Sequence, residues 1–284
     1  RGRTMTPTTP EPCARDMALV DALTGVLAPL LADAPTTDNP RGLGAARAAV
    51  EARLRAMGFD VTHHAAADRP PVLVAVRRGA GPHWIGLSGH YDVELGGDGW
   101  TSDPFVPTCR EGRLYGRGTA DNLGPLLLRL IALEGVARLP SLVWVLQGEE
   151  EIGSPAAHAI YPELRLPPVA LWLEETGYFE LDGRQRVLLR RPSPLTQIWV
   201  DAALELAATA GRGVDLHDRY LNKAFGTHRC PFLTHLVGDS TYLAIGPNDP
   251  RSRIHGADES IPHHNLALSE AQFLAVLRAT AEAA

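Results

Sequence analysis

The chain has 284 residues, of which 45% are hydrophobic and 21% charged, and a formal net charge of -6. These values are typical of a folded globular protein with one large domain or two small ones. Lys223 is the only lysine and no basic run occurs, so we do not expect nucleic acid as a partner. No stretch of about 18 uncharged apolar residues occurs, so we do not expect a membrane span.

Three widely spaced cysteines, Cys13, Cys109 and Cys230, fit neither a disulfide framework nor a cysteine-rich zinc site. Acidic residues near the N-terminus interrupt any apolar core of a secretory signal, which favours a cytoplasmic enzyme. We expect residues 1–13 to be a disordered tail or a cloning remnant and residues 14–284 to form a single domain.

Two helices are predicted first. Apolar residues recur at helical spacing from Met17 to Leu30 and from Leu43 to Met57, and Gly58 ends the second helix. β-Rich runs and further helices then alternate along the chain. We predict strands at residues 59–62, 72–77, 84–88, 142–146, 169–173, 214–217 and 241–245, a β ribbon at 178–190, and helices at 123–138, at 195–210 and at the C-terminus.

A long loop is predicted at residues 89–118, and a loop of this length in a compact domain is more often functional than idle. Ser269 and Gln272 form a capping-box pattern that predicts the start of the last helix. Because helices and strands alternate and several strands are wholly apolar, the sequence predicts an α/β fold with a sheet covered on both faces.

Histidines and carboxylates cluster where predicted apolar strands end, which is where ligands gather in open α/β sheets. Packing carboxylates together is costly, and a divalent cation removes that cost. Mixed His and carboxylate ligands suit zinc, with manganese or cobalt as alternatives, and two ions could share a bridging carboxylate. The segments are Gly89-His90-Tyr91-Asp92, Asp121-Asn122, Gln147-Gly148-Glu149-Glu150-Glu151, Glu174-Glu175 and Ile254-His255-Gly256.

Each of these signals also has an ordinary structural interpretation. An H-x-D pattern often arises by chance or from a core histidine, and acidic runs such as 149–151 are common in solvated turns. The pairs His63-His64 and His263-His264 follow no strand end with acids nearby, so we interpret both as surface or loop histidines. The joint placement of the other residues favours a metal site.

Four motifs stand in a fixed order: Ser88-Gly89-His90-Tyr91-Asp92-Val93; Trp100 with Asp103-Pro104-Phe105; Leu114-Tyr115-Gly116-Arg117-Gly118-Thr119-Ala120-Asp121-Asn122; and Gly148-Glu149-Glu150-Glu151-Ile152-Gly153-Ser154. Together they resemble the zinc peptidases that include carnosinase, aminoacylase-1, carboxypeptidase G and succinyl-diaminopimelate desuccinylase. The resemblance covers roughly residues 14–175 and resumes around His255. It implies a three-layer α/β/α mixed-sheet catalytic domain of the zinc-exopeptidase type.

The resemblance also implies a centre of two divalent metal ions. Asp121 would bridge them and would be joined to Asn122 by a cis peptide bond. The last acidic ligand would be Glu175, with Glu174 as the alternative. The implied ligands are His90, Asp121, Glu151, Glu175 and His255.

For catalysis, the resemblance implies that Glu150 is the general base and that Asp92 orients His90. The implied reaction is hydrolysis of an amide bond in a small peptide or N-acyl amino acid by a metal-bridging hydroxide. Two alternatives stay open. One is a biosynthetic enzyme that hydrolyses, transfers or cyclises an acyl group of a pathway intermediate, and the other is a noncatalytic, metal-stabilised binding protein.

The chain departs from the family after the ribbon that ends near residue 190. Family members usually carry an inserted lid domain there, which supplies dimer contacts, an oxyanion histidine and an arginine for the substrate carboxylate. Here the segment 191–194 leads straight into the next predicted helix. We therefore expect a lidless protein that is a monomer or a dimer of another kind. His228 and Arg229 are the candidates to replace the lid residues, with an ordinary surface loop as the other interpretation.

Overall fold

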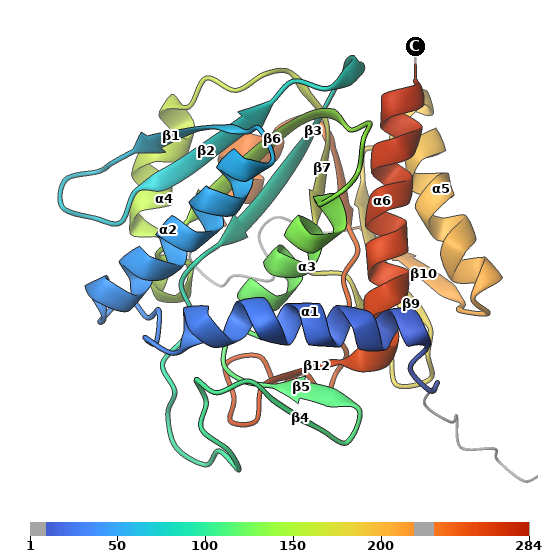
Figure 1. Cartoon of the computed structure of the whole chain (residues 1–284). Coiled ribbons are helices and arrows are strands. Elements are labelled where there is room, and N and C mark those ends of the chain that lie inside the picture. Colours follow the sequence, from blue (N-terminus) through green and yellow to red (C-terminus); the bar gives the residue numbers. More distant parts are fainter. Residues whose placement is uncertain (1–9, 219–229, 284) are drawn as a thin grey trace, which may run out of the picture.

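The computed structural model describes residues 10–218 and 230–283, which fold around one large mixed β-sheet (Figure 1). The sheet has nine strands, in the order β1-β2-β6-β3-β7-β11-β9-β10, with β8 paired to β9. Its strands are β1 (Asp60–His64), β2 (Val72–Arg77), β3 (Ala80–His90), β6 (Pro140–Gln147), β7 (Val169–Glu174), β8 (Tyr178–Phe179), β9 (Gln185–Arg190), β10 (Val214–His217) and β11 (Thr241–Ala244).

Helices cover both faces of this sheet, as Figure 1 shows. The helices on one face are α1 (Ala14–Leu31), α2 (Pro40–Ala56), α3 (Leu123–Leu133), α5 (Pro194–Thr209) and α6 (Leu266–Glu282). The segments on the other face are α4 (Pro155–Ile160), η2 (Tyr161–Glu163) and η3 (Phe232–Val237). This arrangement confirms the predicted three-layer α/β/α fold.

The central strand β6 shows why the sheet needs two covering layers. Leu142, Trp144 and Leu146 point into the core beneath the five long helices, whereas Val143 and Val145 point into the core beneath α4. All five side chains are almost fully buried. Successive strand residues face opposite sides of a sheet, so an unbroken apolar run requires apolar partners on both.

Four neighbouring strands run in the same direction. β6 pairs in parallel with β3, β3 with β7, and β7 with β11. Their carboxyl ends therefore meet at one edge of the sheet, and this edge receives the segments that follow residues 90, 147, 174 and 244.

The predicted loop 89–118 contains regular structure. The strands β4 (Thr108–Arg110) and β5 (Arg113–Tyr115) form a hairpin, and β12 (Ser260–Pro262) pairs with β5 to make a small second sheet. The hairpin was missed because its strands are short and its third strand lies far along the chain.

Three local predictions are wrong. The last helix begins at Leu266, so Ser269 is not its cap but a buried residue inside it. The first turn is capped instead by Asp16 of α1, whose Oδ1 accepts a hydrogen bond of 2.8 Å from Ala267 N. α3 ends at Leu133 because Gly135 adopts a positive φ of 82°. His263 is buried in η4 (His263–Asn265), which packs against α1, and is not on the surface.

Two further features of the described residues bear on the sequence predictions. β9 ends at Arg190 and α5 begins at Pro194, so only residues 191–193 join them. None of the helices in residues 10–218 and 230–283 has both the length and the apolar character needed to cross a membrane.

The contact between β3 and β7 provides a test of the core. A Cβ atom added to Gly86 would lie 2.4 Å from a ring carbon of Trp172, so Gly86→Ala should lower the free energy of unfolding by about 1–3 kcal/mol through overpacking. Gly44→Ala in α2, where the new methyl group would meet open space, should instead raise it by up to about 1 kcal/mol. Denaturant unfolding of both variants measures the two changes, and equal effects would contradict this description of the core.

Candidate metal centre

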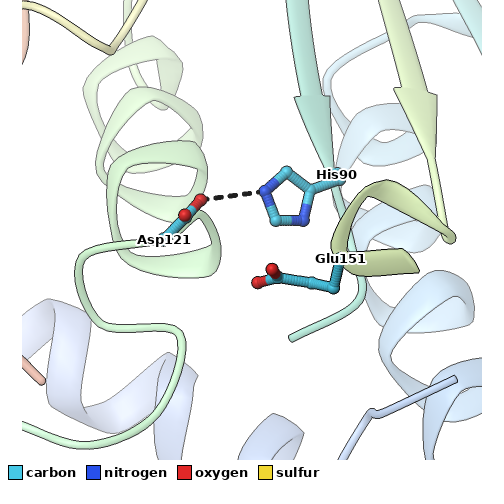
Figure 2. Close-up of side chains that lie close together, drawn as sticks. All are labelled: His90, Asp121 and Glu151. Carbon is cyan, nitrogen blue, oxygen red and sulfur yellow. Dashed lines mark hydrogen bonds and ion pairs between the residues drawn. The ribbon is translucent and has the colours of Figure 1, made fainter. Parts of the chain in front are cut away.

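Four side chains from separate segments converge at the carboxyl edge of the sheet. His90 is the last residue of β3, and Asp121 precedes α3. Glu151 lies in the turn η1 (Glu150–Ile152) after β6, and His255 lies in the loop between β11 and β12. Figure 2 shows the ring of His90 and the carboxylates of Asp121 and Glu151 facing a common space.

Asp121 lies between the two histidines. Its Oδ1 is 3.0 Å from His90 Nε2, and its Oδ2 is 3.2 Å from His255 Nε2. His255 Nε2 is also 2.9 Å from Glu151 Oε2. One carboxylate thus presents an oxygen to each histidine, which is the arrangement that a bridging ligand requires.

His90 is fixed from behind by Asp92. His90 Nδ1 lies 3.0 Å from the main-chain oxygen of Asp92 and 3.2 Å from its Oδ1. Asp92 Oδ2 accepts a hydrogen bond of 3.1 Å from Glu151 N, which ties the strand end to η1. Asp92 is fully buried, so these contacts hold the imidazole with Nε2 directed at Asp121.

The backbone at Asp121 is held by Glu259, a residue that the sequence analysis did not single out. Glu259 Oε1 accepts hydrogen bonds from Ala120 N (2.9 Å) and Asp121 N (3.0 Å), and its Oε2 pairs with Arg117 at 2.7 Å. The available signal was a pair of opposite charges, with Arg117 inside the motif that contains Asp121 and Glu259 four residues after His255. The Asp121–Asn122 peptide bond is cis, as predicted.

The histidines and carboxylates shift one another's pKa values. The bonds from Asp121 and Glu151 raise the pKa of His255 to about 10. Burial opposes protonation of His90, but its bonds to Asp121 and Asp92 outweigh burial and raise its pKa well above the usual value. Burial alone would raise the pKa of Asp121, yet the two histidines hold it far below its usual range. Without a cation, protons on the histidines therefore balance the carboxylates.

Glu150 differs from its neighbours because its carboxylate is left free. Burial raises its pKa above the usual value, against the opposing effect of His90. Within the described part of the chain, no hydrogen bond or ion pair holds this carboxylate. It lines a cavity of about 800 Å³ that also includes His90, Asp121 and His255. The side chain is therefore placed to exchange a proton with a molecule in the cavity.

The structure does not bring Glu175 into the same cage. Its Oε1 accepts from Asn122 Nδ2, and its Oε2 pairs with Arg129 Nη1 at 3.1 Å. Glu174, the alternative, accepts hydrogen bonds from Tyr242 and Thr176. Both glutamates line the cavity. Among the described residues, however, neither belongs to a group of three side chains whose potential metal-ligand atoms all lie within 4.8 Å of one another.

Two such groups are present in the described ranges, and the second contains a residue that the sequence analysis missed. The groups are His90, Asp121 and Glu151, and Glu94, Glu151 and His255. The signal for Glu94 was its position directly after the motif that ends at Val93, two residues beyond Asp92. His228 and Arg229 lie outside the described residues.

Parallel strands that gather histidines and carboxylates at one edge of a helix-covered sheet are the arrangement that the resemblance to zinc peptidases predicts. The chain belongs to peptidase family M20/M25/M40, whose family model matches residues 86–279. This agrees with the resemblance carried by the four motifs.

Individual relatives support the same assignment. The chain is 34% identical over 167 residues to succinyl-diaminopimelate desuccinylase of Sphingopyxis alaskensis, covering 56% of this chain and 44% of that protein. It is 38% identical over 96 residues to the human Beta-Ala-His dipeptidase, and the match covers 31% of this chain and 19% of that protein. In both cases the chain spans less than half of the relative's length. The structure of an M20 family metallo-carboxypeptidase from Sulfolobus solfataricus has the same fold, with a TM-score of 0.71 and 14% identity over 90% of this chain and 99% of that one.

The buried pair of Arg129 and Glu175 gives a prediction about stability. Burial raises the pKa of Glu175 to about 7 despite Arg129, so loss of the guanidinium would leave an uncompensated acid in the core. Arg129→Leu should lower the free energy of unfolding by about 3–5 kcal/mol. Arg53→Gln, which breaks the partly exposed pair with Glu134, should cost less than about 1 kcal/mol. Similar losses in the two variants, measured by denaturant unfolding, would refute this account.

The raised pKa values of both histidines predict proton release on metal binding. A metal ion binds neutral imidazole, so it must displace the protons that His90 and His255 carry at neutral pH. The apparent affinity for Zn²⁺ should therefore rise with pH between about pH 6 and 8. Titration calorimetry in two buffers of different ionisation enthalpy measures the released protons, and identical heats in both buffers would contradict the prediction.

Proposed function

We propose that this protein is a metal-dependent hydrolase that cleaves an amide bond in a small peptide or an N-acyl amino acid. The observation that carries the proposal is the joint placement of His90, Asp121, Glu151 and His255 around one space, with the free carboxylate of Glu150 in the same cavity. Membership of peptidase family M20/M25/M40 supports the reaction class.

The donor set fits two divalent cations. Imidazole and carboxylate ligands suit zinc, with manganese and cobalt as alternatives. Glu151 Oε2 is buried and, apart from its 2.9 Å ion pair with His255 Nε2, has no hydrogen-bond partner among the described residues, so it is available as a ligand. In the proposed centre Asp121 would bridge the ions, His90 and Glu175 would hold one, and Glu151 and His255 would hold the other. Glu175 would have to exchange or share its present partners.

The proposed chemistry divides between the cations and the side chains. When bound, the cations would lower the pKa of a water molecule and polarise the scissile carbonyl. Glu150 would accept the proton of that water and deliver it to the leaving amine, since its raised pKa suits both steps. Asp92 would keep His90 in the orientation that ligation needs.

The substrate is expected to enter from an open side. The short connection at residues 191–193 supports the proposal that the site works without an inserted lid. Apolar side chains of Phe232, Leu233 and Ile254 line the cavity beside the polar groups. A pocket of this kind suits a small substrate with both a carbonyl to polarise and an apolar portion to bury.

Replacement of Glu150 tests the proposal. Glu150→Gln should keep its metal content and fold but lose at least about 100-fold in kcat, because the variant cannot accept the proton. The measurement is turnover of a panel of dipeptides and N-acyl amino acids by the metal-loaded protein, with elemental analysis of both forms.

Glu163→Gln, at an exposed glutamate in η2, is the matched control and should retain full activity. Retention of most activity in Glu150→Gln would refute the base assignment. Absence of turnover in the metal-loaded wild type on the whole panel would favour the noncatalytic alternative, and cyclised or transferred products would favour the acyl-transfer alternative.

A further inference from the structure

We propose that Glu94 is an additional protein ligand of the ion that Glu151 and His255 hold, an inference that rests on the metal centre proposed above. The juxtaposition that carries it is the grouping of one carboxylate oxygen of Glu94, one of Glu151 and one ring nitrogen of His255 within 4.8 Å of one another.

The backbone fixes Glu94 beside Glu151. Glu94 N donates a hydrogen bond of 3.1 Å to Glu151 Oε1, so the two residues are joined before any ion binds. Glu94 Oε1 accepts from Leu95 N at 2.8 Å, which restrains the side chain near its own backbone. The Glu94 carboxylate is therefore held at the rim of the same cage and is not a freely moving surface group.

The local charge balance favours a cation at this position. Asp121, Glu151 and Glu94 place three carboxylates around His255, which can carry one positive charge. Across residues 10–218 and 230–283, no arginine or histidine forms an ion pair with Glu94. Like charges this close disfavour one another unless a cation lies between them. A divalent ion between Glu94, Glu151 and His255 supplies that compensation.

The consequence is an asymmetric centre. With Asp121, an ion beside His255 would have four protein ligands, the number found in closed zinc sites. The ion beside His90 has His90, Asp121 and at most Glu175, whose oxygens are already engaged by Asn122 and Arg129. The open coordination position that catalysis needs would then belong to an ion beside His90, and Glu94 would help to hold the other ion in place.

Metal affinity of the 284-residue chain tests this inference. Zn²⁺ binding to the wild type and to Glu94→Gln is measured by competition with a chelator of known affinity, together with the number of ions bound. Glu94→Gln keeps the shape of the side chain but removes its charge. It should lower the binding affinity for one of the two ions by at least about tenfold. Asp98→Asn, at an exposed acid in the same loop, is the control and should leave both affinities unchanged.

A crystal structure of the zinc-loaded wild type gives a readout that does not depend on any variant folding. We expect a Glu94 oxygen within about 2.0–2.2 Å of the ion that Glu151 and His255 hold. A Glu94 carboxylate directed away from both ions would overturn the inference.

The outcomes separate this inference from the proposed function. Two ions bound by Glu94→Gln as tightly as by the wild type would overturn the role of Glu94 and leave the hydrolase proposal intact. Unchanged metal affinity with a raised KM only for substrates bearing a free amino group would also overturn it, because Glu94 would then bind the substrate ammonium. A wild type that binds no divalent ion would overturn both proposals.

Discussion

The site depends on the position of Asp121 between His90 and His255. A carboxylate with a histidine at each oxygen, and with other acids close by, is stable only when positive charge is present. The two carboxylate-bonded histidines have raised pKa values, so protons there favour the cluster in the absence of a cation, and the proposed cations would replace those protons. The same crowding that makes the cluster costly for an empty protein makes it a good site for divalent ions.

Two buried ion pairs on either side of Asp121 hold the cluster in shape. Glu259, paired with Arg117, accepts from the backbone amide of Asp121, whereas Glu175, paired with Arg129, accepts from the side chain of Asn122. Asn122 Oδ1 in turn accepts from the main-chain nitrogen of His90, at 2.9 Å. Separation of either pair would leave a buried charge uncompensated, which is costly. The two pairs therefore restrain the backbone and side chains around Asp121.

Part of this site was accessible from the sequence because each residue lies at the end of a recognisable element or next to one. His90 ends an apolar strand, Glu151 follows another, and Asp121 precedes an apolar helix. Glu174 and Glu175 could not be distinguished in this way. They are adjacent in the chain but face opposite sides of the sheet, so that Glu174 meets Tyr242 and Glu175 meets Arg129. Glu94 was missed because its proximity to His255 depends on a loop that arrives from far along the chain.

The sequence by itself determined the layered α/β fold, because alternating apolar strands and amphipathic helices can bury their apolar residues only in a sheet covered on both faces. It also determined which strand ends carry histidines and acids. Only the tertiary structure decided the pairing of those groups and some element boundaries. α6 begins where Asp16, 251 positions earlier, supplies an acceptor, and Arg129 can lie in an apolar helix because β7 brings Glu175 to it. Periodicity records which side of an element is buried, whereas the partner of a buried polar group depends on segments that are distant in sequence and close only after folding.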